Sequence, residues 1–283
     1  MLSSRYYTSL RSKTISILPR LQLHHQTTTM SSSSSRPNIQ LYTDQTPNGV
    51  KIPIALEELG LPYQVHSIDI STNKQKEAWF LAINPNGRIP AITDTLPNGE
   101  TVRVFESASI LLYLIEQYDP EHKLSYPRGT KEYYEMINWL MFQNAQLGPM
   151  QGQANHFFRY APEKIKYGID RYVNETRRVY KVLDTHLSSA GSEYLVGNKC
   201  TIADCTTIGW VFWAAWAGVE IDEFPTLKKW KERMMARPAV AKGNDVPHPS
   251  KLKDILGDEK KLEEYAKHAS GWILKGMKDD EKK

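Results

Sequence analysis

Apolar residues along the chain follow two periodicities, which divide the sequence into two regions. Between residues 38 and 118, short stretches rich in β-branched and aromatic residues alternate with segments of helical periodicity. The predicted elements are a strand at 39–43, a helix at 52–59, a strand at 63–70, a helix at 76–83, strands at 89–93 and 101–105, and a helix at 107–118. This order predicts a mixed α/β domain over about residues 38–122.

From residue 128 to 246 only the helical periodicity remains, which predicts an all-α domain. The helices are expected at 132–146, from Pro162 to about Leu187, after Thr201, and from Pro225 to Pro238. Gly148-Pro149 predicts a kink or a break, because a proline inside a helix lacks the N–H that the helix uses. The charged segment 247–283 is expected to hold an amphipathic helix, either packed or free, with the apolar residues Leu252, Ile255, Leu256, Leu262 and Tyr265.

Residues 1–36 have a different composition from the rest of the chain. They are rich in Ser, Thr and Arg, and no acidic residue precedes Asp44. This composition favours a mitochondrial transit peptide, with a disordered tail as the alternative. Met30 opens a Ser run just before the folded region, so a second start there would give a cytoplasmic form.

Charge and cysteine content exclude several classes of protein. The formal net charge is +4, and five basic residues before Pro37 account for it, so the body is near neutral and no nucleic-acid surface is expected. No apolar run approaches the ~18 residues of a membrane span. The two cysteines, Cys200 and Cys205, are expected to be buried, and no metal site is predicted. Any thiol chemistry would therefore use a thiol carried by a ligand.

The stretch from Asn84 to Tyr118 carries the strongest candidate motif. Asn84-Pro85-Asn86-Gly87 is a dense turn signal, and Pro90 stands at the start of a short apolar strand, where a missing N–H is tolerated. Ser107 stands where a helix N-cap is expected. Taken alone, Glu106-Ser107 is more often an ordinary helix cap.

This stretch resembles the glutathione-binding half of glutathione transferases, whose core motif is N-P-x-G-x-I-P followed by E-S at a helix start. The resemblance implies a thioredoxin-like N-terminal domain plus an all-α C-terminal domain, the cytosolic glutathione transferase fold. It also implies a cis bond before Pro90 and pairing of the Ile89 backbone with the cysteinyl unit of glutathione. Ser107, at a helix start, would bind the γ-glutamyl carboxylate, and Glu106 would hold its ammonium group.

Thr46-Pro47-Asn48-Gly49 resembles one subclass, the Nu-class enzymes and the fungal nitrogen-regulator-like proteins. This resemblance implies that Asn48 activates the sulfur, with Thr46 as a second candidate. Gln75 would bind the glycyl carboxylate and Arg171 would reach glutathione from the helical domain. The plain alternatives are a turn residue for Asn48 and a solvated helix charge for Arg171. Tyr42 is interpreted as structural.

Two functions follow as hypotheses from the resemblance. The first is a glutathione transferase whose thiolate reduces a disulfide or peroxide, or conjugates a small electrophile. The second is a non-catalytic regulatory or interaction module that keeps the fold. Glutathione is the only cofactor expected, and a homodimer is predicted. The acceptor is expected in a cleft between the domains, lined by the aromatic residues Trp139, Phe142, Phe157 and Tyr160.

Overall fold

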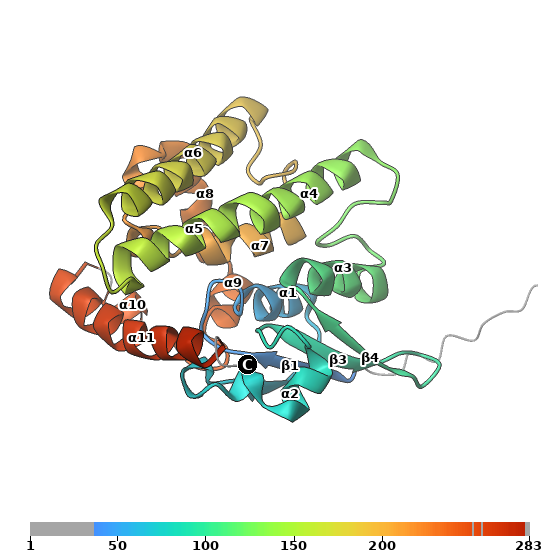
Figure 1. Ribbon diagram of the computed structural model, residues 1–283. Helices are drawn as coiled ribbons and strands as arrows, with labels where there is room; N and C mark the ends of the chain where they lie inside the picture. Colours follow the sequence, from blue (N-terminus) through green and yellow to red (C-terminus); the bar gives the residue numbers. More distant parts are fainter. Residues whose placement is uncertain (1–36, 251, 256, 281–283) are drawn as a thin grey trace, which may run out of the picture. The chain divides into compact units, whose positions relative to one another are not determined.

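The computed structural model describes residues 37–250, 252–255 and 257–280. Its sheet contains strands β1 (Ile39–Thr43), β2 (Tyr63–Ser67), β3 (Ala91–Thr95) and β4 (Thr101–Phe105), in the order β2-β1-β3-β4 (Figure 1). β1 is parallel to β2 and antiparallel to β3, and β3 is antiparallel to β4. β2 ends at Ser67, three residues earlier than the apolar pattern predicts, because the chain then turns into a 3₁₀ helix capped by the Asp69 side chain.

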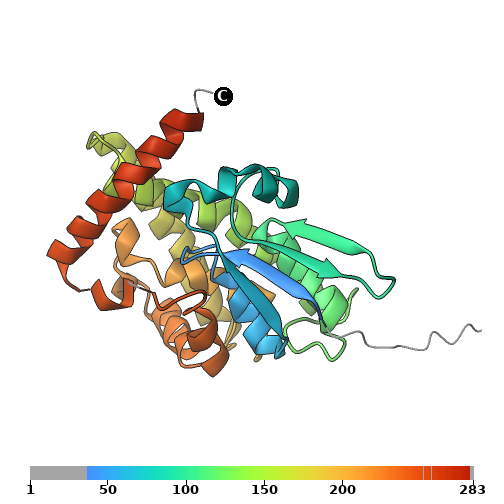
Figure 2. The ribbon, with the colours of Figure 1, turned by 90° about the horizontal axis from the view of Figure 1, so that it is seen from below.

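Three helices complete the α/β domain: α1 (Lys51–Leu59), α2 (Ala78–Ile83) and α3 (Ser107–Tyr118). α1 and α3 lie on one face of the sheet and α2 on the other (Figures 1 and 2). α1 ends at Gly60, whose positive φ of 70° suits glycine. The predicted thioredoxin-like domain is confirmed.

The helical domain contains α4 (Lys131–Phe142), α5 (Gly148–Asn155), α6 (Lys166–Ala190), α7 (Ile202–Val211), α8 (Pro225–Met235) and α9 (Pro238–Gly243). Of the predicted kink or break at Gly148-Pro149, the break does not occur. A π-helical turn over Gln143–Leu147 joins α4 to α5, and Pro149 falls in the first turn of α5. The wider turn removes the need for the N–H that proline lacks, so the chain continues as helix. α7 is buried at every position and starts, as predicted, after Thr201, which forms a capping box with Asp204.

After α9, the chain forms the short α10 (Leu252–Ile255) and the long α11 (Glu259–Asp280). α11 packs on the body through the buried Leu262 and Ala266, which join a cluster with Phe212 and Trp216. The predicted tail helix is thus confirmed as packed. Leu256 and the transit-like residues 1–36 lie outside the described residues. In the described part of the chain, no helix is both long and apolar enough for a membrane span.

The α/β domain and the helical domain meet through α1. It packs against α9 at Gly243, where an added Cβ would lie 2.5 Å from the Ile54 backbone. Beside this contact, the Arg237 guanidinium donates two hydrogen bonds to the Glu58 carboxylate, at 2.6 and 2.7 Å. These contacts hold the middle and the C-terminal end of α1 against the helical domain.

Candidate active site

The turn between β1 and α1 is rigidly built. The Gly49 N–H donates to Thr46 Oγ1 at 2.9 Å, and the Thr43 hydroxyl donates to the Gly49 carbonyl at 2.8 Å. A Cβ at Gly49 would lie only 2.0 Å from the Asp44 carbonyl oxygen, so a side chain there would displace the turn. The Thr46 hydroxyl accepts a bond within the turn and keeps its own proton to donate. The turn thus holds Thr46 and Asn48 at the N-terminal end of α1.

Asn48 is oriented by Trp210 on α7. The Trp210 indole N–H donates to Asn48 Oδ1 at 2.9 Å. An indole N–H can only donate, so the oxygen of the amide faces Trp210 and the NH₂ group faces away. No hydrogen bond within the described residues uses that NH₂ group. Sequence reasoning missed Trp210, because 162 positions separate the two residues and the apolar pattern of α7 reads only as core.

The peptide bond between Ile89 and Pro90 is cis, as the resemblance predicts. The turn before it is fastened by Asn84, which is buried. Its side chain donates to the Arg88 carbonyl at 2.6 Å and accepts the Asn86 N–H at 3.0 Å. Pairing of β3 begins only at Ala91, so the Ile89 backbone lies beyond the sheet ladder. The structure therefore presents Ile89 as a free peptide edge.

Ser107 and Glu106 stand together at the start of α3. Glu106 occupies the N-cap position with φ of 68°, and Ser107 is the first helical residue, so the prediction that Ser107 is the N-cap is off by one position. Ser107 is buried and Glu106 is exposed. The free N–H groups of the first turn and the helix dipole favour an anion here.

Lys51 lies beneath this helix start and was missed by sequence reasoning. Its side chain is 1% exposed, and its ammonium donates to Ser107 Oγ at 3.2 Å and to Gln143 Oε1 at 2.6 Å. Burial lowers the pKa of Lys51 to about 7, while the nearby Glu106 carboxylate opposes the shift. With its oxygen accepting from Lys51, Ser107 has its hydroxyl proton left to donate to a ligand. A lysine inside an apolar helix pattern carries no sequence signal that distinguishes this position from a solvated one.

Gln75 and Arg171 are less closely tied to these groups. Gln75 donates weakly to the Ile70 carbonyl at 3.4 Å, and its Oε1 is buried without a hydrogen-bond partner among the described residues. Arg171 is exposed on α6 and lies over the neighbouring Tyr172 ring at 5.8 Å. No contact of the described residues joins Arg171 to the other predicted residues. Tyr42 stacks on His66, in keeping with its structural interpretation.

Comparison with known proteins decides the family. Residues 46–117 match the family model described as glutathione S-transferase, N-terminal domain, and residues 147–238 match glutathione S-transferase, C-terminal domain. The chain is 40% identical over 218 residues to the glutathione S-transferase-like protein gedE of Aspergillus terreus, a match covering 72% of this chain and 93% of that protein. The chain belongs to the glutathione S-transferase family.

Two further members of the family bear on the site. The disulfide-bond oxidoreductase YfcG of Escherichia coli is 41% identical over 226 residues, covering 78% of this chain and 98% of its own length. A glutathione transferase homolog from Lodderomyces elongisporus, solved with two glutathione molecules per subunit, is 46% identical. Its TM-score is 0.70, and the match covers 74% of this chain and 99% of that one.

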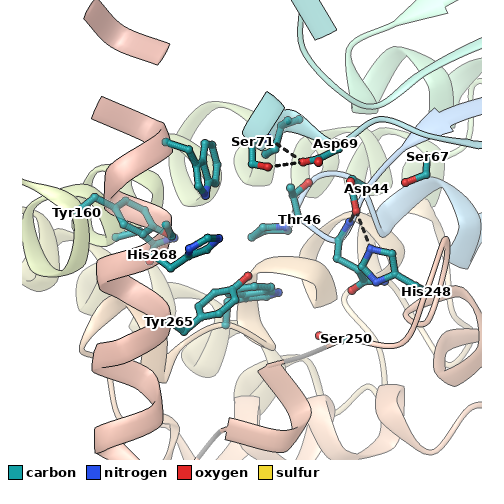
Figure 3. Close-up of a pocket in the computed structure, with 17 residues that line it drawn as sticks. Asp44, Thr46, Ser67, Asp69, Ser71, Tyr160, His248, Ser250, Tyr265 and His268 are labelled. Carbon is teal, nitrogen blue, oxygen red and sulfur yellow. Dashed lines mark hydrogen bonds and ion pairs between the residues drawn. The ribbon is translucent and has the colours of Figure 1, made fainter. Parts of the chain in front are cut away.

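The chain has a pocket of about 470 Å³ beside the β1–α1 turn (Figure 3). Thr46 and Pro47 line one side, and Tyr160 lies across from Thr46. Tyr265 and His268 project into the pocket from α11. Of the four aromatic residues expected around the acceptor, only Tyr160 lines this pocket. Trp139 and Phe142 pack on each other against the main core, and Phe157 stacks on Tyr172. These three do not line this pocket, and their place around the acceptor stays a prediction.

Both cysteines are buried, as predicted. Burial and the neighbouring Cys205 raise the pKa of the Cys200 thiol. A raised pKa leaves a thiol protonated and poorly nucleophilic. No group of three or more metal-ligating side chains occurs among the described residues. What the described site offers a ligand is the set of hydrogen-bond donors at Thr46, Asn48 and Ser107.

Proposed function

We propose that the protein is a glutathione-dependent reductase of small disulfides or peroxides, with weaker conjugation of electrophiles, in a subclass similar to the Nu-class and fungal nitrogen-regulator-like transferases. The observation that carries the proposal is the fixed orientation of Asn48. Its oxygen is held by Trp210, so its N–H groups are directed away as donors. A thiolate is the group that such donors would stabilise.

Glutathione is proposed to lie along the free edge at Ile89. Its cysteinyl unit pairs with the Ile89 backbone beside Pro90, and its γ-glutamyl carboxylate binds at Ser107, over the buried Lys51 ammonium. Glu106 takes the γ-glutamyl ammonium, and Gln75 the glycyl carboxylate. Arg171 would close over the ligand only if its exposed side chain turns from Tyr172, which makes it the least supported member of the site.

Asn48 then has one chemical task. A free thiol has a pKa of about 8.5, and lowering it by about two units requires roughly 2.7 kcal/mol of preferential thiolate stabilisation. Hydrogen bonds from N–H groups to an anion in a partly buried site contribute stabilisation energies of that order. The Thr46 hydroxyl is the second donor in the proposal.

The reduction proceeds by two thiol–disulfide exchanges. The glutathione thiolate attacks one sulfur of the disulfide, the S–S bond breaks, and the mixed disulfide forms as a thiolate leaves and takes a proton. A second glutathione thiolate attacks the glutathionyl sulfur of the mixed disulfide and releases the second thiol. Two glutathione molecules are oxidised to glutathione disulfide and one disulfide is reduced to two thiols. The relative solved with two glutathione molecules per subunit supports room for both.

The test is turnover of glutathione with 2-hydroxyethyl disulfide, beside conjugation of an aromatic chloride. We expect disulfide reduction to exceed conjugation, and Asn48→Ala to lower kcat at least tenfold with glutathione still bound. Asn98→Ala, which removes an exposed turn amide, is the matched control and should not change kcat. Glutathione binding without turnover of any acceptor would contradict the proposal and favour the regulatory module.

Two further proposals concern the whole protein. The family resemblance supports a homodimer, and the acid-free segment 1–36 supports delivery to mitochondria. Light scattering of the purified chain tests the first, with a monomer at micromolar concentration as the contradicting result. Fractionation of cells that make the chain with and without residues 1–36 tests the second, with identical distributions as the contradicting result.

A further inference from the structure

We infer that the tail helix α11 builds the acceptor pocket and gives it a preference for neutral or cationic aromatic compounds that carry an N–H or O–H donor. The inference deepens the proposed function, since it names the acceptor class of that same site. α11 begins at Glu259, and the family model for the C-terminal domain ends at residue 238. The helix is therefore outside the matched family models.

The N-terminal half of α11 is fastened to the helical domain. Leu262 and Ala266 are buried, the Arg159 guanidinium donates to the Glu259 carboxylate at 3.1 Å, and the Ser270 hydroxyl donates to the Tyr160 carbonyl at 2.6 Å. The Arg159 side chain is itself only 9% exposed, so this ion pair is largely shielded on the body side. These contacts fix α11 in place as a wall.

The C-terminal half of α11 reaches the thioredoxin-like domain. It packs against the 3₁₀ turn Ile70–Thr72, and a Cβ at Gly276 would lie 3.6 Å from Asn73 Oδ1. In the middle of α11, Tyr265 and His268 (Figure 3), together with Trp272, line the pocket. The helix thus bridges both domains across the pocket and supplies one side of it.

One part of the pocket wall is aromatic. Tyr160 and Trp213 of the helical domain and Tyr265 and Trp272 of α11 all line it. Trp213 and Tyr160 are held by ring contacts with Trp216, so these two walls are rigid. Rings in this arrangement favour a flat aromatic ligand, because offset and edge contacts between rings add to the burial of apolar surface. A pocket of about 470 Å³ is in the range that takes small molecules.

Among the described residues that line the pocket, one buried side-chain polar atom lacks a hydrogen-bond partner. Asn155 lines the pocket and is 7% exposed, and its Oδ1 is buried with no hydrogen bond among the described residues. A buried acceptor without a partner is costly, at about 1–3 kcal/mol. A ligand that carries an N–H or O–H would satisfy it, and this requirement selects for a donor.

The charged groups of the pocket disfavour an anion. Asp44 and Asp69 line it, and among the described lining residues none is lysine or arginine. His248 is paired with Asp44 at 3.1 Å, which leaves His268 as the lining imidazole without a carboxylate partner in the described chain. An anionic acceptor would meet two carboxylates with little to offset them, whereas a neutral or cationic one would not.

The experiment measures fluorescence-detected binding of 1-aminonaphthalene to the full chain with S-methylglutathione present. The same ring with a carboxylate, 1-naphthoate, and the donor-free N,N-dimethyl-1-naphthylamine are the matched ligands. We expect 1-naphthoate to bind at least tenfold more weakly than 1-aminonaphthalene. Equal or tighter binding of 1-naphthoate would overturn the inference.

Variants of Trp272 and Asn155 test what the aromatic ring and the unpaired amide oxygen each contribute to binding. Trp272→Ala is expected to weaken 1-aminonaphthalene about tenfold, whereas Lys267→Ala, at an exposed position of α11 that does not line the pocket, should stay within twofold. If Trp272→Ala does not fold, Trp272→Leu keeps apolar volume without the ring and should still weaken binding. Asn155→Ala should weaken 1-aminonaphthalene and leave the dimethyl analogue unchanged. Equal effects of the Trp272 and Lys267 variants would overturn the role of α11.

The binding assay involves no turnover, so it separates the two proposals. Binding as predicted without any disulfide reduction would contradict the proposed function and leave this inference standing. If the chain reduces 2-hydroxyethyl disulfide normally but Trp272→Ala leaves binding of the aromatic ligand unchanged, this inference is contradicted and the proposed function stands.

Discussion

At the scale of single residues, the site depends on side chains that fix other side chains. Trp210 sets which end of the Asn48 amide faces outward, and Lys51 sets which way the Ser107 hydroxyl can donate. Neither Trp210 nor Lys51 is proposed to touch the reacting sulfur. Their effect is orientation, which matters because a donor must be aimed before the charge develops.

Trp210→Phe tests this orienting role. The change keeps an aromatic ring in α7 and removes the N–H, so the Asn48 amide can turn over. We expect kcat for disulfide reduction to fall about tenfold and the KM for glutathione to change little. Trp139→Phe is the matched control, because the Trp139 N–H is buried and donates to no acceptor in the described chain. A kcat equal in both variants would contradict the role of Trp210.

Lys51 predicts a specific dependence of stability on pH. Its pKa is about 7 in the folded chain, against 10.5 when exposed, so the unfolded chain binds more protons between these values. The free energy of unfolding therefore rises with pH across this window, and the contribution is lost as the pH falls toward 7. Met cannot titrate, so Lys51→Met is the reference. Relative to this variant, the free energy of unfolding of the wild type should rise by on the order of 2 kcal/mol between pH 7 and pH 9. Urea unfolding at both pH values measures this.

The same variant bears on ligand binding. A carboxylate at Ser107 favours the protonated lysine, so S-methylglutathione should bind the wild type more tightly at pH 6 than at pH 8. Glu106 is the carboxylate that already faces Lys51, and Gln143 and Thr206 are neutral. Calorimetry with Lys51→Met should give a flat profile between these pH values. A parallel decline in both proteins would show that another group is responsible.

At the scale of elements, the β1–α1 turn works because α7 meets it without a side chain in between. A Cβ at Gly209 would lie 2.4 Å from the Pro47 carbonyl oxygen. Trp210, next in α7, then reaches Asn48. The close approach of helix and turn thus sets the geometry of the proposed sulfur donor.

Gly209→Ala should push the turn from α7. We expect a loss of about 2 kcal/mol in the free energy of unfolding, the cost typical of overpacking, together with a tenfold or larger loss of kcat/KM. Gly271→Ala in α11 is the control, because its Cβ meets nothing within 4 Å and alanine favours a helix. Chemical unfolding and disulfide turnover measure both. An active, fully stable Gly209→Ala would contradict this account of the turn.

The elements were more predictable from the sequence than their contacts. Strand and helix patterns depend on neighbouring residues, and the structure confirms them. The cap at Gly60 and the capping box at Thr201 are local features of the same kind. The helix through Pro149 contradicts a local rule because a π-turn, which the sequence does not signal, removes the conflict. Lys51, Trp210 and Asn155 gain their roles from partners far along the chain, so no local pattern could identify them.

At the scale of the whole molecule, the proposed site draws on both domains. The thioredoxin-like domain contributes Asn48, Ile89 and Ser107, and the helical domain holds them through Trp210 and Gln143. The described tail, α11, spans from one domain to the other across the acceptor pocket. A change at the α1–α9 contact between the domains, the joint formed with Arg237 and Glu58, should therefore alter glutathione binding at the distant site.

Arg237→Gln tests that joint. It removes the paired bonds to Glu58, whose side chain is only 9% exposed, and leaves a nearly buried carboxylate. We expect a loss of about 2 kcal/mol in the free energy of unfolding and a raised KM for glutathione. Lys228→Gln, which breaks an exposed pair with Asp222, should have no measurable effect. Equal stabilities of the two variants would contradict the importance of the joint.

The pKa of the thiol of bound glutathione tests the central claim most directly. It is measured from the ultraviolet absorbance of the thiolate as the complex is titrated. The account predicts a pKa about two units below the ordinary value of about 8.5 in the wild type, and a return of at least about one unit toward that value in Asn48→Ala. A bound thiol that titrates at its ordinary pKa, or one that Asn48→Ala leaves unchanged, would contradict it.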